Sequence, residues 1–243
     1  MSARRFFVDG SRGAGERVAI GERDAHKIAR VLRLRDGDEL EIVDAAGHTF
    51  DARVRLEPQG LHAELTAVRA AALPVGLHVD IAQGIPKGAK MDFVIEKATE
   101  LGAAAILPFY SRRSVVQDLG DAKLERWRRL AKTAAAQCDR REIPEVRAPS
   151  TFEALLDRCA EYDLVLMPWE RAASDPLRAS LPGWLERAHR VLVIVGPEGG
   201  FSADEAELGR AAGARLVSLG ERLLRSETAG LAMLAILDYA SAT

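Results

Sequence analysis

Two short segments near the carboxyl end of the chain combine glycines with charged side chains in a way that suits a ligand site. Residues 196–202 read GPEGGFS, and residues 219–228 read LGERLLRSET. Glycines let the backbone approach a ligand and leave its amides free to bind it. The first segment matches neither phosphate-binding glycine pattern, and it carries Glu198 where a polyphosphate would need neutral amides or a lysine. The pattern therefore favours a cationic or zwitterionic ligand with an adenine-like part.

The elements around the first segment are those that position a ligand loop in a parallel α/β sheet. Val191–Val195 is a continuous apolar run, which predicts a strand buried on both faces. Ser202-x-x-Glu205 has the form of a capping box, so a helix should begin where the glycines end. Small molecules bind at such junctions, at the carboxyl ends of strands. A glycine turn that serves only tight packing is the structural alternative.

Other charged residues are weaker candidates for a ligand or substrate site. Arg112, Arg113 and Ser114 come directly after a predicted strand at residues 105–110, so we expect them at the same edge of the sheet. Four more charged residues lie in or after the segment GIPKG: Lys87, Lys90, Lys97 and Glu100. Lysines on the wet face of a helix are commonplace, and a solvated surface is an equally simple interpretation of this second group.

The amino-terminal region is basic although the chain as a whole carries a net charge of only −2. Residues 1–35 hold nine Lys or Arg against four Asp or Glu. Residues 24–34 read as a helix whose inward side chains we expect to be Ile28, Val31 and Leu32. Its outer face carries a basic stripe: Arg23, Lys27 and Arg30. Such a stripe can follow a phosphate backbone, and the alternative is a solvated charged surface.

Periodicity divides the chain into two regions. Strands are predicted at residues 38–44, 49–57 and 61–70, which indicates short antiparallel strands in a small barrel. A linker is expected at Ala70–Leu73, ending in Pro74. From Val75 onward, strands alternate with helices, which predicts a mostly parallel sheet covered on both faces. The expected strands are 77–82, 105–110, 164–168, 191–195 and 216–219. The expected helices are 90–101, 123–137, 152–161 (opened by a capping box of Ser150 and Glu153) and 203–212.

GPEGGFS and LGERLLRSETA together resemble the paired signature of the SPOUT superfamily of S-adenosylmethionine-dependent RNA methyltransferases. Within it the chain is most similar to the RsmE-type enzymes, which methylate N3 of a uridine in small-subunit (16S) ribosomal RNA. The resemblance extends through HKIARVLRLRDGDEL, KGAKMDFVIEKATELG and SRRSVV. It implies an α/β fold with a SPOUT-like parallel sheet and a C-terminal trefoil knot in residues 73–243. A small β-barrel PUA-like RNA-binding domain would precede it in residues 1–72.

The resemblance also implies a cofactor, S-adenosyl-L-methionine, and a set of contacts. The expected cofactor-binding residues come from the end of the third strand and from both signature loops: Leu166, Met167, Pro168, Gly196, Pro197, Glu198, Gly199, Gly200, Leu219, Gly220, Leu223, Leu224, Arg225, Ser226 and Thr228. The expected contacts to RNA are basic or hydroxyl side chains: Arg4, Arg5, Arg23, Lys27, Arg30, Arg112, Arg113 and Ser114.

The implied reaction needs help with a proton. N3 of uracil is an imide nitrogen that is mostly protonated at neutral pH, so a base, or cations that stabilise the uracil anion, must assist. No histidine lies in the motifs, which leaves Glu198, Glu227 and solvent as acceptors. Arg225, Arg112 or Arg113 could stabilise the anion. We favour Arg225, because its motif ties it to the cofactor loop, and we count Glu198 as the second catalytic candidate. The target base must also be unpaired or flipped out.

Three positions depart from the family pattern. Ala136 stands where RsmE-type proteins usually have a glutamate, and Asp139 stands near a usual glycine. If that glutamate handles substrate in relatives, another residue must do so here. Ser226 replaces the usual threonine and keeps its hydroxyl group.

Composition excludes several classes of protein. No apolar stretch is long enough to span a membrane and no secretory signal is present, so we expect a cytoplasmic protein. The two cysteines, Cys138 and Cys159, are expected to be reduced thiols. The five histidines are scattered without metal-ligand spacing, so no metal site is expected.

The sequence also bears on assembly and on other classes of function. Residues 227–239 form an apolar helix that should be buried against something beyond its own sheet, which predicts a homodimer. The main functional alternative is a non-catalytic RNA-binding or ribosome-assembly protein that retains a methyltransferase fold. A dinucleotide-dependent dehydrogenase is weaker, because its glycine fingerprint is absent.

Overall fold

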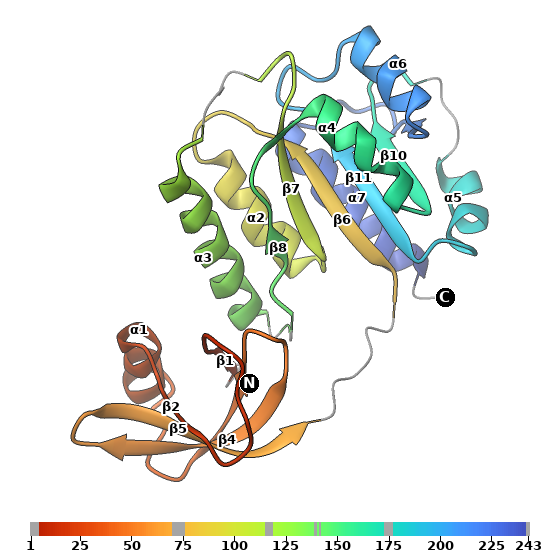
Figure 1. The fold of residues 1–243 in the computed structure, drawn as a ribbon. Coiled ribbons are helices and arrows are strands. Elements are labelled where there is room, and N and C mark those ends of the chain that lie inside the picture. Colours follow the sequence, from red (N-terminus) through yellow and green to blue (C-terminus); the bar gives the residue numbers. More distant parts are fainter. Residues whose placement is uncertain are drawn as a thin grey trace. The chain divides into compact units, whose positions relative to one another are not determined.

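The computed structural model describes residues 5–69, 76–114, 119–138, 140, 142–172 and 177–241 (Figure 1). The chain divides into two compact units. The first combines Met1–Val75 with Ala135–Glu142, and the second combines Gly76–Ala134 with Ile143–Thr243. The linker predicted at residues 70–74, the RNA contact predicted at Arg4 and the departure at Asp139 lie outside the described residues.

The first unit is built on one five-stranded sheet. Its strands are β1 (Arg5–Phe7), β2 (Arg17–Ala19), β3 (Glu39–Val43), β4 (Thr49–Glu57) and β5 (Gly60–Arg69), in the order β1-β3-β4-β5-β2. Apolar side chains from all five strands meet in one core. The alternating pattern located β3, β4 and β5 to within one residue. β1 and β2 were not predicted because three residues are too few to show an alternation. The pairing of β1 with β3 is parallel, which corrects the expectation of antiparallel strands alone.

The amino-terminal helix is shorter and more irregular than predicted. An α-helical turn, α1 (Glu22–His26), continues into the π-helical turn η1 (Lys27–Val31). Ile28 is buried as expected, but Val31 is 66% exposed, so the prediction that it faces inward was wrong. In a π-helix each residue turns the chain by less than in an α-helix, so a residue three positions on rotates away from the buried face.

The second unit contains a parallel sheet. Its strands are β6 (His78–Gly84), β7 (Ala105–Tyr110), β8 (Glu145–Val146), β9 (Ser150–Thr151), β10 (Leu164–Pro168), β11 (Arg190–Val195) and β12 (Arg215–Val217). The strand order is β12-β10-β11-β6-β7-β8, with β9 also beside β7. All the strand pairs described here are parallel, as the alternation of strands and helices predicts.

Helices cover both faces of this sheet (Figure 1). They are α2 (Lys90–Glu100), α3 (Asp121–Gln137), α4 (Phe152–Leu156) with the 3₁₀ turn η2 (Asp157–Glu161), α5 (Leu177–Leu185), α6 (Ala203–Ala211) and α7 (Ser226–Ser241). Two separate cores result. Along β11, Val191, Val193 and Val195 enter the core shared with α2, α3, α5 and α7. The alternate residues Leu192 and Ile194 enter the core shared with α4 and η2.

The residues that begin the helices can be compared with the capping signals in the sequence. The capping box at Ser202 is present, with both of its hydrogen bonds to Glu205. The second predicted box was wrong, because Thr151 rather than Ser150 caps α4 by accepting from the amide of Ala154. Helix α5 was not predicted, because Pro182 lies inside it and reads as a helix breaker.

None of the helices among the described residues has the length and apolar character needed to cross a membrane. The described residues also contain no cluster of three or more His, Cys, Asp or Glu side chains that could hold a metal ion.

Candidate functional site

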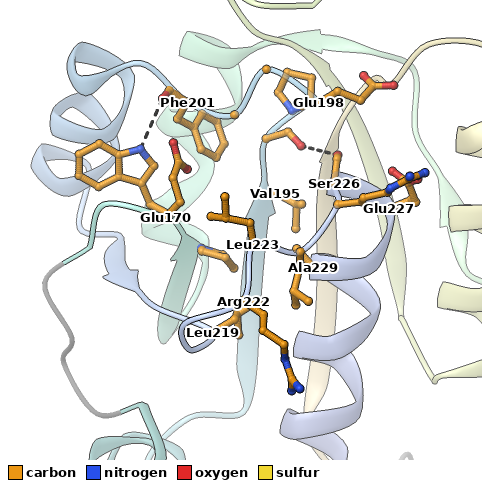
Figure 2. Close-up of a pocket in the computed structure, with 18 of the residues that line it drawn as sticks. Glu170, Val195, Glu198, Phe201, Leu219, Arg222, Leu223, Ser226, Glu227 and Ala229 are labelled. Atoms are coloured by element: carbon orange, nitrogen blue, oxygen red, sulfur yellow. Dashed lines mark hydrogen bonds and ion pairs between the residues drawn. The ribbon is translucent and has the colours of Figure 1, made fainter.

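A cavity of about 620 Å³ lies at the carboxyl ends of the adjacent strands β12, β10 and β11 (Figure 2). Three chain segments line it, each at or directly after the end of one of these strands: 168–170, 195–201, and 218–229 without Thr228. Lys90 from α2 completes the lining. The two signature segments, which are separated in sequence by α6 and β12, therefore line one cavity.

Most of the predicted cofactor-binding residues line this cavity: Pro168, Gly196, Pro197, Glu198, Gly199, Gly200, Leu219, Gly220, Leu223, Leu224, Arg225 and Ser226. Leu166, Met167 and Thr228 do not. Leu166 and Met167 alternate along β10, so their side chains enter the two cores on opposite faces of the sheet. Thr228 is an exposed residue of α7.

The cavity also has lining residues outside the predicted cofactor-binding set, among which only Lys90 and Glu227 were noted as candidates in the sequence. They are Lys90, Trp169, Glu170, Val195, Phe201, Ser218, Glu221, Arg222, Glu227 and Ala229. Most flank a predicted residue directly, so extending each motif by one or two positions would have found them. Trp169 donates from its ring nitrogen to the carbonyl of Phe201 over 3.4 Å, which ties the β10 loop to the glycine loop.

The glycine loop, residues 196–201, is packed closely on its neighbours. A β-carbon at Gly196 would lie 3.2 Å from the ring of Phe201, and one at Gly199 would lie 3.1 Å from Cβ of Arg113. The guanidinium of Arg113 donates to the carbonyl oxygen of Gly199 over 2.6 Å. A larger residue at Gly199 would therefore displace Arg113.

A buried hydrogen-bond network fixes the base of the cavity. Ser226 donates from its hydroxyl to the carbonyl oxygen of Gly196 over 2.5 Å and accepts from Nε2 of Gln83 over 2.8 Å. Gln83 is fully buried at the end of β6. Next to it, a β-carbon at Gly84 would lie 2.6 Å from the backbone nitrogen of Pro197, so only glycine fits there without movement. The hydroxyl of Ser226 thus has a structural task, holding the start of α7 against the glycine loop.

Four charged side chains gather on one side of the cavity. Glu198 accepts from the backbone amide of Lys87 and from Nζ of Lys90, both over 3.0 Å. Burial raises the pKa of Glu198, but hydrogen bonds from Lys90, its own amide and Lys87 outweigh this, and the pKa is lowered overall. Glu227 has one oxygen 3.8 Å from Lys90 and 3.9 Å from Arg225. The Arg225 side chain is 80% exposed.

The loop after β7 is engaged with the protein itself. The backbone amide of Arg112 donates to the buried carboxylate of Glu205, which also completes the capping box of α6. The side chain of Arg112 pairs with Asp204 over 3.2 Å, and the hydroxyl of Ser114 accepts from the amide of Ser111. This predicted RNA-binding loop therefore braces the glycine loop and α6. Arg112 and Arg113 are both exposed residues of this loop, and the side chain of Arg112 is 61% exposed.

The predicted RNA contacts of the first unit divide into two kinds. Arg23 and Arg30 are exposed on α1 and η1, and Lys27 is half-buried with its ammonium group over the ring of Phe6. Arg5, in contrast, is 5% exposed, and its guanidinium binds Glu41. Arg5 therefore supports the sheet from β1 and is not available on the surface, which corrects its assignment to RNA.

Ala136, where relatives usually have a glutamate, belongs to the first unit. It packs with Ala135 against Phe7 and Val43. The alanine therefore has a packing task in this chain.

The fold and the cavity together define a methyltransferase-like α/β unit joined to a small β unit. Residues 73–238 match the family model of the RNA methyltransferase domain, and residues 20–66 match that of the RNA methyltransferase PUA domain. Ribosomal RNA small subunit methyltransferase E of Bacillus subtilis is 32% identical, with 97% of this chain and 96% of that protein covered. The Synechocystis protein of the same name is 32% identical over 90% of this chain and 71% of its own length.

Solved structures agree. A putative methyltransferase from Legionella pneumophila with bound S-adenosylmethionine has a TM-score of 0.85 at 28% identity, covering 99% of this chain and 98% of that one. Ribosomal RNA small subunit methyltransferase E from Neisseria gonorrhoeae, bound to S-adenosylmethionine, has a TM-score of 0.82 at 28% identity, covering 98% and 97%. The chain belongs to the RNA methyltransferase family that includes ribosomal RNA small subunit methyltransferase E.

Proposed function

We propose that this protein binds S-adenosylmethionine in the cavity after β10, β11 and β12 and methylates N3 of a uridine in small-subunit ribosomal RNA. The observation that carries the proposal is the meeting of both signature segments in one cavity that offers backbone groups and carboxylates. Relatives covering nearly the whole chain are named for methylation of small-subunit ribosomal RNA, and two solved relatives hold this cofactor.

The lining fits such a cofactor. The backbone of residues 196–200 and 218–220 can recognise an adenine-like group through amides and carbonyls, and glycines in both stretches permit close approach. Carboxylates line the same cavity: Glu170, Glu198, Glu221 and Glu227. They favour a ligand that carries positive charge. When bound, S-adenosylmethionine supplies an electrophilic methyl group.

The protein's own contribution is orientation and charge. N3 lies on the Watson–Crick edge of uracil, so the target base must leave any base pair before it reacts. The guanidinium of Arg225 reaches solvent at the mouth of the cavity and keeps its charge at any working pH. We propose that it stabilises the negative charge that develops on the uracil ring.

The first experiment is calorimetric titration with S-adenosylmethionine, NAD and ATP. Only S-adenosylmethionine should bind at micromolar concentration. The second is methylation of small-subunit RNA, with the product nucleoside identified by mass spectrometry. A ribose-methylated or carbon-methylated product would refute the assignment to N3 and leave the cofactor assignment standing. Cofactor binding without methyl transfer to RNA or to small subunits would support a non-catalytic assembly protein instead.

We further propose that the second unit contains a trefoil knot. The support is topological: the chain passes from β12, at one edge of the sheet, to α7, which packs on β6 and β11 nearer the centre. The connecting segment must therefore pass the ends of β10 and β11. A substrate in the small ribosomal subunit also implies that the protein works in the cytoplasm.

A homodimer is the last part of the proposal. Helix α7 buries Ala229, Met233, Leu234 and Leu237 within its own unit. This unit therefore covers more of the helix than the sequence suggested. Its remaining face still exposes Ile236 and Tyr239, the latter by 85%. We propose that a second copy covers this face. Sedimentation of a monomer at micromolar concentration would contradict it.

A further inference from the structure

Glu227 is a carboxylate whose environment is unusual within the cavity. It is the second residue of α7, its side chain is 12% exposed, and it lines the cavity. Its Oε2 atom is buried and has no hydrogen-bond partner within the described residues. Its Oε1 atom lies 3.8 Å from Nζ of Lys90 and 3.9 Å from Arg225, which are ion-pair distances too long for hydrogen bonds. Leaving such a group unsatisfied is costly, and groups of this kind are found at functional sites.

Glu198, on the same side of the cavity, has the opposite environment (Figure 2). Its Oε1 atom accepts hydrogen bonds from Lys87 and Lys90, and its pKa is lowered overall, because these bonds outweigh the effect of burial. A carboxylate held in this way is a weak proton acceptor, and protonating it would release Lys90. Glu198 is therefore suited to positioning Lys90. Glu227, in contrast, has no side-chain hydrogen bond to lose when it accepts a proton.

We propose that Glu227, rather than Glu198, accepts the N3 proton of the target uracil. This inference rests on the proposed function. The N3–H bond breaks, the proton passes to a carboxylate oxygen of Glu227, and the electron pair remains on the uracil ring. That pair forms the new bond from N3 to the methyl carbon. The bond from this carbon to the sulfonium breaks, and its electrons stay on sulfur to give a neutral thioether. Glu227 then releases its proton to water.

The two cations beside Glu227 complete the step. Proton transfer moves one negative charge from the carboxylate to the uracil ring, so Lys90 and Arg225 lose one anionic partner and gain another within the same cavity. Lys90 stays anchored through its 3.0 Å bond to Glu198. Arg225, with 80% of its side chain exposed, is free to follow the charge. The cavity therefore keeps its charge balance while the proton moves.

The test compares Glu227→Gln with wild type in single-turnover methylation of small-subunit RNA. Glutamine keeps the shape of the side chain and cannot accept the proton. We expect cofactor affinity within about threefold of wild type and a methyl-transfer rate lower by about 10²–10⁴. The deficit should shrink as pH rises, because hydroxide then ionises the imide without the enzyme's base. Glu207→Gln, the same change on a side chain of α6 that is 70% exposed, should leave the rate unchanged.

Two further variants separate proton transfer from structure. Glu227→Ala should regain part of its rate with added formate, which can occupy the vacated space and accept the proton. Glu198→Gln should lose rate by a factor that stays constant with pH, as expected for a positioning residue. An unchanged rate in Glu227→Gln, or a deficit that does not vary with pH, would overturn the inference alone. A wild-type protein that forms no N3-methyluridine would overturn the proposed function as well.

Discussion

The two signature segments line one cavity but differ in how firmly the protein holds them. The glycine loop, residues 196–201, is fixed by side chains from four other segments, among them Gln83, Arg113, Trp169 and Ser226. In the second segment, residues 220–225 are all exposed, and Leu223 is 82% exposed. Within the described part of the chain, no hydrogen bond involves residues 221–224. One wall of the cavity is therefore preformed, and the other can become ordered around a ligand.

This difference suggests a division of labour. A preformed wall lowers the entropy lost on binding, and a loose wall can admit the ligand and then close on it. Arg225 lies at the junction, because its carbonyl oxygen accepts the first amides of α7 while its side chain belongs to the exposed segment.

The largest effect is expected from Arg225→Ala. Loss of the cation should lower the rate of methyl transfer at saturating cofactor by about 10²–10³, since this is the usual effect of removing one group that stabilises charge in a transition state. The unfolding temperature should hardly change, because the side chain is 80% exposed. Rapid-quench kinetics and a thermal melt check the two parts. Wild-type turnover in this variant would remove Arg225 from the reaction.

Gly84→Ala should destabilise the preformed wall. Its new methyl group would lie 2.6 Å from the backbone nitrogen of Pro197, and backbone cannot move aside as a flexible side chain can. We expect a loss of about 1–3 kcal/mol in the free energy of unfolding, together with weaker cofactor binding. Gly183→Ala is the matched control in the same unit, because a β-carbon there would meet nothing within 4 Å. Equal urea midpoints for the two variants would show that the close approach is unimportant.

Ser226→Ala should have a somewhat smaller effect. It leaves the carbonyl of Gly196 without its hydroxyl donor and removes the 2.8 Å acceptor of Gln83, which should lower stability by about 1–2 kcal/mol. Ser226→Thr keeps the hydroxyl and should lie near wild type. Ser218→Ala, just before the exposed residues 220–225, should change stability by less than about 0.5 kcal/mol. Denaturant unfolding of the three variants ranks them, and the opposite order would contradict the assignment of the rigid wall.

The smallest effect concerns pH. The folded protein lowers the pKa of Glu198, from an ordinary value of 4.5, so its hydrogen bonds stabilise the fold above that pH. This contribution should disappear as pH falls through the lowered value and the carboxylate takes up a proton. The stability difference between wild type and Glu198→Gln should therefore be present at pH 7 and shrink as pH falls below 4.5. A difference that persists unchanged at pH 3 would show that the carboxylate charge plays no part.

Sequence patterns located β6, β7, β10 and β11 of the second unit closely, because strands buried on both faces read as continuous apolar runs, but they missed β8, β9 and α5. They also located both walls of the cavity, since glycines and charges mark them. Patterns did not show which side chains hold the walls in place. Gln83 and Arg113 act through the three-dimensional approach of β6 and of the loop after β7 to the glycine loop, and no spacing in the sequence encodes that distance.

Burial explains the remaining errors. The resemblance and its charge assigned Arg5 to RNA, but its pairing with Glu41 across β1 and β3 buries it. Glu227 stood only among the alternatives for the proton acceptor, although its unsatisfied buried oxygen distinguishes it in the structure. Arg5 is buried by a partner that lies far along the chain, and Glu227 is distinguished by a partner that is missing. Composition reveals neither.

Hydrogen exchange with and without S-adenosylmethionine distinguishes the two walls of the cavity. Residues 221–224 should exchange fast in the free protein and become strongly protected with the cofactor. Residues 196–201 should be protected in both states and change little. If S-adenosylmethionine changes the exchange of neither segment, or changes only that of the glycine loop, the cavity does not have one preformed wall and one wall that the cofactor orders.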